Sequence, residues 1–182
     1  LCTRPLSRDL IALAEQKGFQ VDIVPFIKIE PIHSDELHQR IQHLSSQVVT
    51  AVFTSRNAAD AVIRQLNGLK PTWRLFCLDN TTYKTLVQYF GKEAIGGVAC
   101  NASALAGTII NTGNAHTAVF FCGDQRRDEL PSLLKEKQIT VHEVTVYKTI
   151  ILNSKINRDY RGILFFSPTA VSAFFWNNTI SA

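Results

Sequence analysis

The chain has 182 residues, 46% hydrophobic and 19% charged, a composition typical of a globular protein that can bury a core. No apolar run approaches the roughly 20 residues of a membrane-spanning helix and no signal-peptide pattern opens the sequence, so we expect a cytoplasmic protein without a membrane partner. The net charge is +4, and the basic residues are scattered along the chain. They are not interleaved with aromatic residues as they are in proteins that bind single-stranded nucleic acid. The charge fits a small anionic ligand at least as well as nucleic acid, and we expect no nucleic-acid partner.

Strand-like and helix-like segments alternate along the chain. Apolar runs predict strands at 21–26, 48–53, 74–78, 96–99, 117–122, 141–147 and 162–166. Amphipathic patterns predict helices at 7–17, 34–44, 57–67, 82–90, 103–110, 127–137 and 168–176. This alternation with short connections predicts an α/β fold in which parallel sheets are flanked by helices.

Two internal similarities indicate two domains of the same kind. The segment TSRNAADAV (54–62) resembles FSPTAVSAF (166–174), since in each a serine after an apolar strand starts a helix of small residues. The segment SRDLIALAEQKGFQVDIVPF (7–26) also resembles RDELPSLLKEKQITVHEVTV (127–146). A chance match between amphipathic helices is the alternative explanation.

The extended segments suggest where the two domains meet. Residues 27–32 and 145–152 are expected to form a two-stranded β connector. The connector would join an inner domain, 33–144, to a discontinuous outer domain made of 1–26 and 153–182. Three strands alone would leave the outer sheet with an unpaired edge, so we expect this domain to lack its C-terminal part here.

Small polar residues follow most of the predicted strands. Helix capping is the simpler interpretation of each position taken alone, because Ser, Thr, Asn and Asp are the preferred N-caps. Taken together, these residues lie at the carboxyl ends of parallel strands, where open α/β sheets bind ligands. Hydroxyls, amides and positive helix ends at such an edge suit carboxylates or phosphates. The candidates are Thr3, Ser55, Asn57, Thr81, Thr82, Ser103, Gly123, Ser167 and Thr169.

Several chemical classes lack their sequence signatures. The chain has no glycine-rich nucleotide motif and no GxSxG nucleophile turn. Its four cysteines are widely spaced, and among its histidines only His38 and His43 are near one another on a predicted helix, so we expect reduced thiols and no metal. An enzyme of this kind would need no cofactor. Tyr147 is the best titratable candidate, with a packing role as the alternative.

Four segments in this order resemble the uroporphyrinogen-III synthase family. They are VFTSRNAADAV (52–62), CGDQRRDELP (122–131), VTVYKT (144–149) and FFSPTAV (165–171). The resemblance implies a cofactor-free, monomeric enzyme of tetrapyrrole and heme biosynthesis, with two α/β domains joined by a two-stranded ladder. Its substrate would be hydroxymethylbilane, a linear tetrapyrrole with eight carboxylates. Cyclisation with inversion of ring D, through a spirocyclic intermediate, would give uroporphyrinogen III.

The resemblance also implies roles for the candidate residues. Tyr147 and Thr82 would be catalytic, with Tyr147 bonding the departing hydroxyl. Gly123 would end its strand so that the backbone can approach a ligand. The charged residues after it would be a solvated helix start braced by Arg127. The substrate-binding set would be Thr3, Ser55, Asn57, Thr81, Ser103, Gly123, Ser167 and Thr169.

Two other classes of function fit part of the pattern. A non-catalytic protein whose two lobes close on an anionic small molecule would need the same polar edges. A nucleotide-sugar enzyme is a weaker alternative, because no phosphate-binding loop is present. Formation of product separates the synthase from the binding protein.

Overall fold

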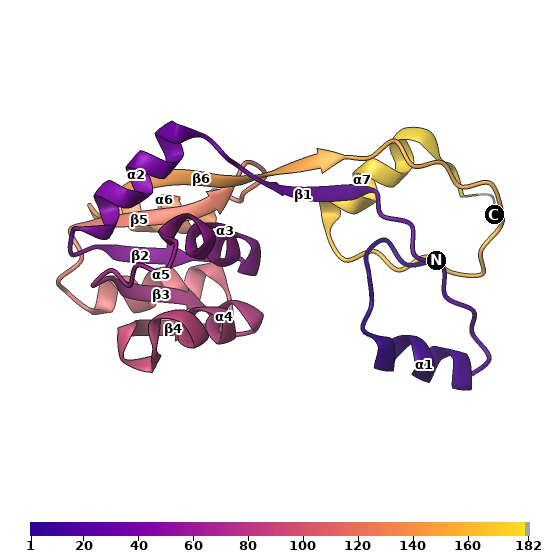
Figure 1. Cartoon of the computed structure of the whole chain (residues 1–182), viewed down its shortest axis with the longest axis horizontal. Coiled ribbons are helices and arrows are strands. Elements are labelled where there is room, and N and C mark those ends of the chain that lie inside the picture. The colour runs from indigo at the N-terminus through magenta and orange to yellow at the C-terminus, as the bar shows by residue number, and fades with distance from the viewer. Residues whose placement is uncertain (181–182) are drawn as a thin grey trace. The chain divides into compact units, whose positions relative to one another are not determined.

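Six strands form one mixed sheet in the order β1-β6-β5-β2-β3-β4 in this computed structural model, which describes residues 1–180 (Figure 1). The strands are β1 Ile27–Pro31, β2 Thr50–Phe53, β3 Arg74–Leu78, β4 Ile95–Ala99, β5 Thr117–Gly123 and β6 Thr140–Ile151. The helices are α1 Arg8–Gln16, α2 Asp35–Ser45, α3 Arg56–Leu66, α4 Thr81–Phe90, α5 Ala102–Asn111, α6 Glu129–Glu136 and α7 Pro168–Asn177, with a short 3-10 helix η1 Lys92–Ala94. The α/β fold with helices beside a sheet is therefore confirmed.

The chain divides into two compact units. One is Glu30–Lys148, and the other joins Leu1–Ile29 to the segment that begins at Thr149. Strands β2 to β6 pair in parallel, as predicted. The sheet is mixed because β1 runs antiparallel to β6: the N–H of Ile32 bonds the carbonyl of Val146, and the N–H of Leu152 bonds that of Phe26.

The central strands of the larger unit are buried on both faces. Alternate side chains of one strand belong to different apolar clusters: Ala51 and Phe53 of β2 lie in one, and Val52 lies in the other. The first cluster is completed by helices α2, α3 and α4, and the second by α5 and α6. This two-sided burial explains why the strand sequences are apolar at consecutive positions.

The strand order reverses between β2 and β5. From β2 the chain moves outward through β3 to β4, then returns to place β5 on the other side of β2, followed by β6. Helices α3 and α4 therefore cover one face and α5 and α6 the other, as right-handed crossovers require. In open α/β sheets the crevice at such a reversal is the common place for a ligand.

The smaller unit has much less regular structure than the sequence predicts. The strands predicted at 21–26 and 162–166 are wrong: the structure has only single parallel bridges, from Cys2 to Ile23 and from Cys2 to Leu164. Ile23 is 37% and Leu164 58% exposed, and α1 buries no residue. With little apolar cover over these segments, alternating apolar residues gain too little from burial to order a sheet.

The apolar core of this unit is small. It consists of Leu1, Phe26, Ala173 and Phe174, with the rings of Phe26 and Phe174 5.2 Å apart in an edge-to-face contact. The side-chain amide of Asn178 links the end of α7 to the segment around residue 154, because it donates to the carbonyls of both Ser154 and Phe174. Over residues 1–180, no helix is long and apolar enough to cross a membrane.

Candidate functional site

A pocket of about 410 Å³ opens at the carboxyl ends of the parallel strands of the larger unit. Thr54 and Ser55 reach it from the end of β2, and Gly123 reaches it from the end of β5. These two strands flank the reversal of strand order, so the pocket occupies the place where an α/β sheet of this kind binds ligands. Tyr147 of β6 forms a further part of its wall.

An irregularity in the sheet aims Tyr147 at this pocket. Cys122 pairs with Thr145, but the next residue, Gly123, pairs with Tyr147, so Val146 is an extra residue on β6. An extra residue turns the following side chain away from the usual alternation. As a result Val146 and Tyr147, although adjacent in sequence, both pack against the same apolar cluster.

Position 123 requires glycine because the Tyr147 ring occupies the space where a side chain would lie. A Cβ on residue 123 would lie 2.8 Å from the Tyr147 hydroxyl oxygen and closer still to the ring carbons. The N–H of Asp124 also bonds the Tyr147 carbonyl at 3.2 Å, which fixes the two backbones together. The glycine thus admits an aromatic ring of the protein itself, a reason that the sequence did not reveal.

Two hydroxyls meet at the wall of the pocket. The Tyr147 and Ser55 side-chain oxygens are 3.3 Å apart, and either can be the donor. Ser55 is also the N-cap of α3, where its oxygen accepts a hydrogen bond from the Ala58 N–H at 3.1 Å. That bond leaves the Ser55 proton able to point at the Tyr147 oxygen, which would turn the Tyr147 proton outward.

The surroundings of the pocket suit an anion. The N-termini of α3 and α5 lie there, because their caps, Ser55 and Asn101, are both wall residues. Helix N-termini carry partial positive charge. Arg126 and Arg127 are also wall residues, although the carboxylates of Asp128 and Glu143 already offset the charge of Arg126, and Glu129 is the one acidic wall residue.

Arg126, rather than Arg127, is the arginine that braces this region. The Arg126 guanidinium pairs with the carboxylates of Asp128 and Glu143, and these partners raise its pKa, the hydrogen bond to Asp128 most. Arg127 is exposed and has no ion pair among residues 1–180. Helix α6 starts only at Glu129, so most of the charged stretch is a loop and not the predicted helix start.

The thiol beneath the pocket is protected from ionisation. Burial, and then the charge of Glu143, raise the pKa of Cys122, outweighing the opposing effect of Arg126. On strand β3, which β2 separates from β5, burial and Asp79 raise the pKa of Cys77 to about 11. Both thiols are neutral at physiological pH and are therefore poor nucleophiles.

Three of the predicted site residues come together in this pocket: Ser55, Gly123 and Tyr147. The others of the larger unit do not line it. Of these, Thr82 is only 1% exposed, and the exposed ones lie in the first turns of α3, α4 and α5: Asn57, Thr81 and Ser103. The predicted residues of the smaller unit are Thr3, Ser167 and Thr169.

The residues of the smaller unit have local structural roles there. The Thr3 side chain is 2% exposed and donates to the Leu164 carbonyl at 3.1 Å. Ser167 caps α7 by accepting from the Ala170 N–H at 3.1 Å, as the capping interpretation predicts. Whether these residues also bind a ligand stays a prediction.

The binding residues chosen from the sequence omit several wall residues, among them Cys100, Asn101 and Arg126. Asn101 caps α5 through a 2.9 Å bond from the Ala104 N–H, whereas the predicted Ser103 lies inside the helix. The signal was present, since an Asn two residues after a strand is a preferred cap. For Arg126 no sequence signal distinguishes it from its neighbour.

A larger hollow of about 650 Å³ lies at the opposite, amino-terminal ends of the strands. Arg74, His116 and His142 are among its wall residues, and none of the predicted site residues lies there. The described residues contain no group of three His, Cys, Asp or Glu side chains arranged to hold a metal ion. We therefore take the carboxyl-end pocket as the candidate site.

Comparison with known proteins gives one family and one fold. The family model described as Uroporphyrinogen-III synthase HemD matches residues 8–179. A mutant uroporphyrinogen III synthase from the extremely thermophilic bacterium Thermus thermophilus is similar in structure, with a TM-score of 0.59 and 18% identity, over 80% of this chain and 60% of that one. The wild-type Thermus enzyme gives a TM-score of 0.52 at 19% identity, over 84% and 62% of the two chains.

A structure from a second organism gives a similar result. Uroporphyrinogen-III synthetase from Helicobacter pylori has a TM-score of 0.56 at 14% identity, over 88% of this chain and 73% of that one. Such low identities show the shared fold alone. The chain spans about 60% of the length of the Thermus structures that it matches.

Proposed function

Because the chain belongs to the uroporphyrinogen-III synthase family, we propose that it converts hydroxymethylbilane into uroporphyrinogen III. The reaction closes the linear tetrapyrrole with inversion of ring D and needs no cofactor. We include in the proposal that the protein acts as a monomer in the cytoplasm. The predicted inner and outer domains with their two-stranded connector, and the site residues outside the pocket, belong to the proposal as well.

One observation carries the proposal most directly. The hydroxyls of Tyr147 and Ser55 lie 3.3 Å apart in a pocket at the reversal of the sheet, beside two helix N-termini and two arginines. A substrate with many carboxylates needs the positive surroundings, and loss of its terminal hydroxyl needs a proton donor. The pocket offers both.

The hydroxyl pair supports a specific division of roles. Ser55 is fixed by the bond from Ala58, and in the proposed arrangement it is the donor of the two hydroxyls, with the Tyr147 oxygen as acceptor. The Tyr147 hydroxyl then gives its proton to the hydroxyl of the substrate as the C–O bond breaks and water leaves, and the N–H proton lost by the same pyrrole ring restores the tyrosine. The azafulvene so formed attacks the substituted carbon of ring D to give the spirocyclic intermediate, which fragments and recloses with ring D inverted.

Holding the linear tetrapyrrole in the correct conformation is the larger part of catalysis. In water the same azafulvene closes without inversion and gives the I isomer. The protein must therefore hold ring D so that its substituted carbon is the one attacked, which is catalysis by orientation. Anchoring of carboxylates by helix N-termini and arginines serves this purpose.

Isomer analysis tests the proposal. Hydroxymethylbilane is generated in the presence of the purified protein, and the uroporphyrin I and III isomers are separated after oxidation. We expect isomer III to predominate. Isomer I alone, formed at the rate without protein, would overturn the proposal and leave the non-catalytic anion-binding protein as the function to test.

A further inference from the structure

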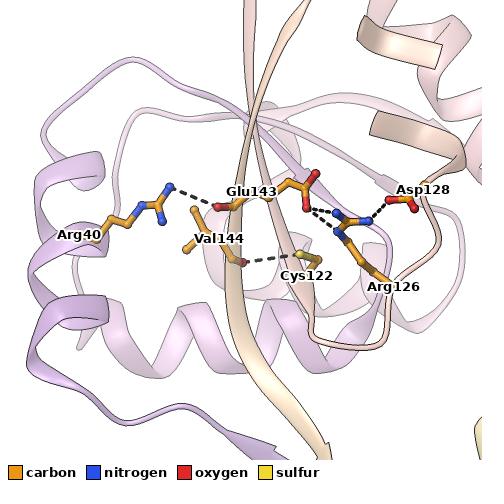
Figure 2. Close-up of polar contacts among 6 residues, drawn as sticks. All are labelled: Arg40, Cys122, Arg126, Asp128, Glu143 and Val144. Atoms are coloured by element: carbon orange, nitrogen blue, oxygen red, sulfur yellow. Dashed lines mark hydrogen bonds and ion pairs between the residues drawn. The ribbon is translucent and has the colours of Figure 1, made fainter. Parts of the chain in front are cut away.

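Arg126 is held at the wall of the pocket by two carboxylates. Its Nε and Nη2 atoms donate to one oxygen of Glu143, while Nη1 donates to Asp128 (Figure 2). The guanidinium carries more N–H donors than these bonds use. Arg126 is also a wall residue of the pocket, the place where a ligand would bind.

The two partners of Arg126 differ in how firmly they are fixed. Glu143 sits within β6, pairs with Phe120 of β5, and its carbonyl accepts from Arg40 at 3.2 Å (Figure 2). Its side chain is 25% exposed. Asp128 lies in the loop just before α6 and its side chain is 79% exposed. An exposed ion pair contributes little, so Asp128 is the partner that a ligand can replace.

The Asp128 carboxylate also has an alternative hydrogen-bonding partner, the N-terminus of α6. Asp128 occupies the N-cap position of α6, where its side chain makes no capping bond and is bonded to Arg126 instead. Aspartate at an N-cap normally accepts from the first N–H groups of the helix. If Arg126 turned to another carboxylate, Asp128 could cap α6 once its backbone had rotated from its helical φ of −81° and ψ of −6° to the extended conformation of an N-cap, and that new bond would offset the lost ion pair.

From this geometry we propose that Arg126 binds a carboxylate of the ligand and that Asp128 is its latch in the empty pocket. Glu143 holds the guanidinium in place throughout. On binding, the ligand carboxylate replaces Asp128, which moves to cap α6. The inference rests on the proposed function only in taking the carboxylate to be a substituent of a tetrapyrrole.

The proposal predicts opposite effects on ligand affinity when Arg126 and Asp128 are replaced. Binding is measured by fluorescence titration with uroporphyrin III, a fluorescent porphyrin with eight carboxylates. We expect Arg126→Gln to weaken binding about tenfold, since it removes a charge-assisted bond. Asp128→Asn should instead tighten binding about two- to fivefold, because it removes the competing carboxylate from Arg126.

Matched controls separate the latch from general electrostatics. Glu136→Gln removes the same charge from the far end of α6, and Lys135→Gln removes a positive charge there. Each should change the dissociation constant by less than about twofold, as expected for exposed charges that are screened by salt. Thermal unfolding of every variant establishes that it is folded at the assay temperature.

A double variant supplies the decisive comparison. In the Arg126→Gln background, Asp128→Asn should change the dissociation constant no more than Glu136→Gln does, because Asp128 then has no guanidinium to bond. Equal effects of Asp128→Asn with and without Arg126, or unchanged binding in Arg126→Gln, would overturn the proposal. These measurements need no turnover, so failure of the synthase activity is scored separately by the isomers formed.

Discussion

Replacing Gly123 with alanine should destabilise the protein although alanine normally suits such a position better. Gly123 does not have a positive φ, so its backbone conformation is open to any residue. In that situation a Gly→Ala change usually stabilises by about 0.4–1 kcal/mol, because the unfolded chain loses freedom. At position 123 the change in stability should have the opposite sign, because the added Cβ would overlap the Tyr147 ring.

The size of the effect follows from what must move. To admit the Cβ, the Tyr147 ring has to shift away from position 123, which separates its hydroxyl from Ser55 and disturbs its packing against the core. Inserting a methyl group into a packed site costs about 1–3 kcal/mol. We therefore expect Gly123→Ala to lower the free energy of unfolding by about that amount.

Urea unfolding with a matched control measures this effect. Gly107 in α5 has open space where a Cβ would go, so Gly107→Ala should stabilise the protein by up to about 1 kcal/mol. In a Tyr147→Ala background the penalty of Gly123→Ala should disappear, because the overlapping ring is gone. A penalty of the same size with and without the ring would refute the reasoning.

Three further changes test the surroundings of the site. Ser55→Ala should cost about 1 kcal/mol of unfolding free energy through the lost α3 cap, more than Ser7→Ala on α1, which buries no residue; urea unfolding compares the two. Because the folded pKa of Cys77 is about 11 and the unfolded one 9.0, Cys77 should contribute stability that is present below pH 9 and falls by about 2–3 kcal/mol between pH 9 and 11, so over this range the native protein should lose that much more stability than Cys77→Ala. With an alkylating reagent at neutral pH, the exposed Cys100 should react in the folded protein, and Cys77 and Cys122 only after unfolding, as mass spectrometry of digests would show; modification of Cys122 in the native protein would contradict its burial.

The larger unit follows from its sequence because local signals and burial agree there. The run VVTAVF (48–53), for example, is apolar at nearly every position and is followed by a capping residue, Ser55, and an amphipathic helix. All five strands predicted within Glu30–Lys148 exist, with ends that differ by a few residues. In the smaller unit, the run at 162–166 had the same appearance, but too little apolar surface covers it to order a strand.

The details of the site depended on tertiary contacts that no local pattern carries. The extra residue at Val146 that turns Tyr147 toward Ser55 leaves no mark in the apolar alternation of β6. The choice between Arg126 and Arg127 depends on Glu143, which is distant in sequence and brought near by strand pairing. Tyr147 was the best titratable candidate in the sequence and its catalytic role came from resemblance to a family, whereas its contacts came from the fold.

The central claim is that the Tyr147 hydroxyl assists the chemical step. The most direct test compares the rate of uroporphyrinogen III formation by the native protein and by Tyr147→Phe, which keeps the ring over Gly123 and removes only the hydroxyl. We expect the rate to fall at least about a hundredfold, the usual range for lost acid catalysis, with unchanged binding of uroporphyrin III. An unchanged rate of isomer III formation would contradict the account.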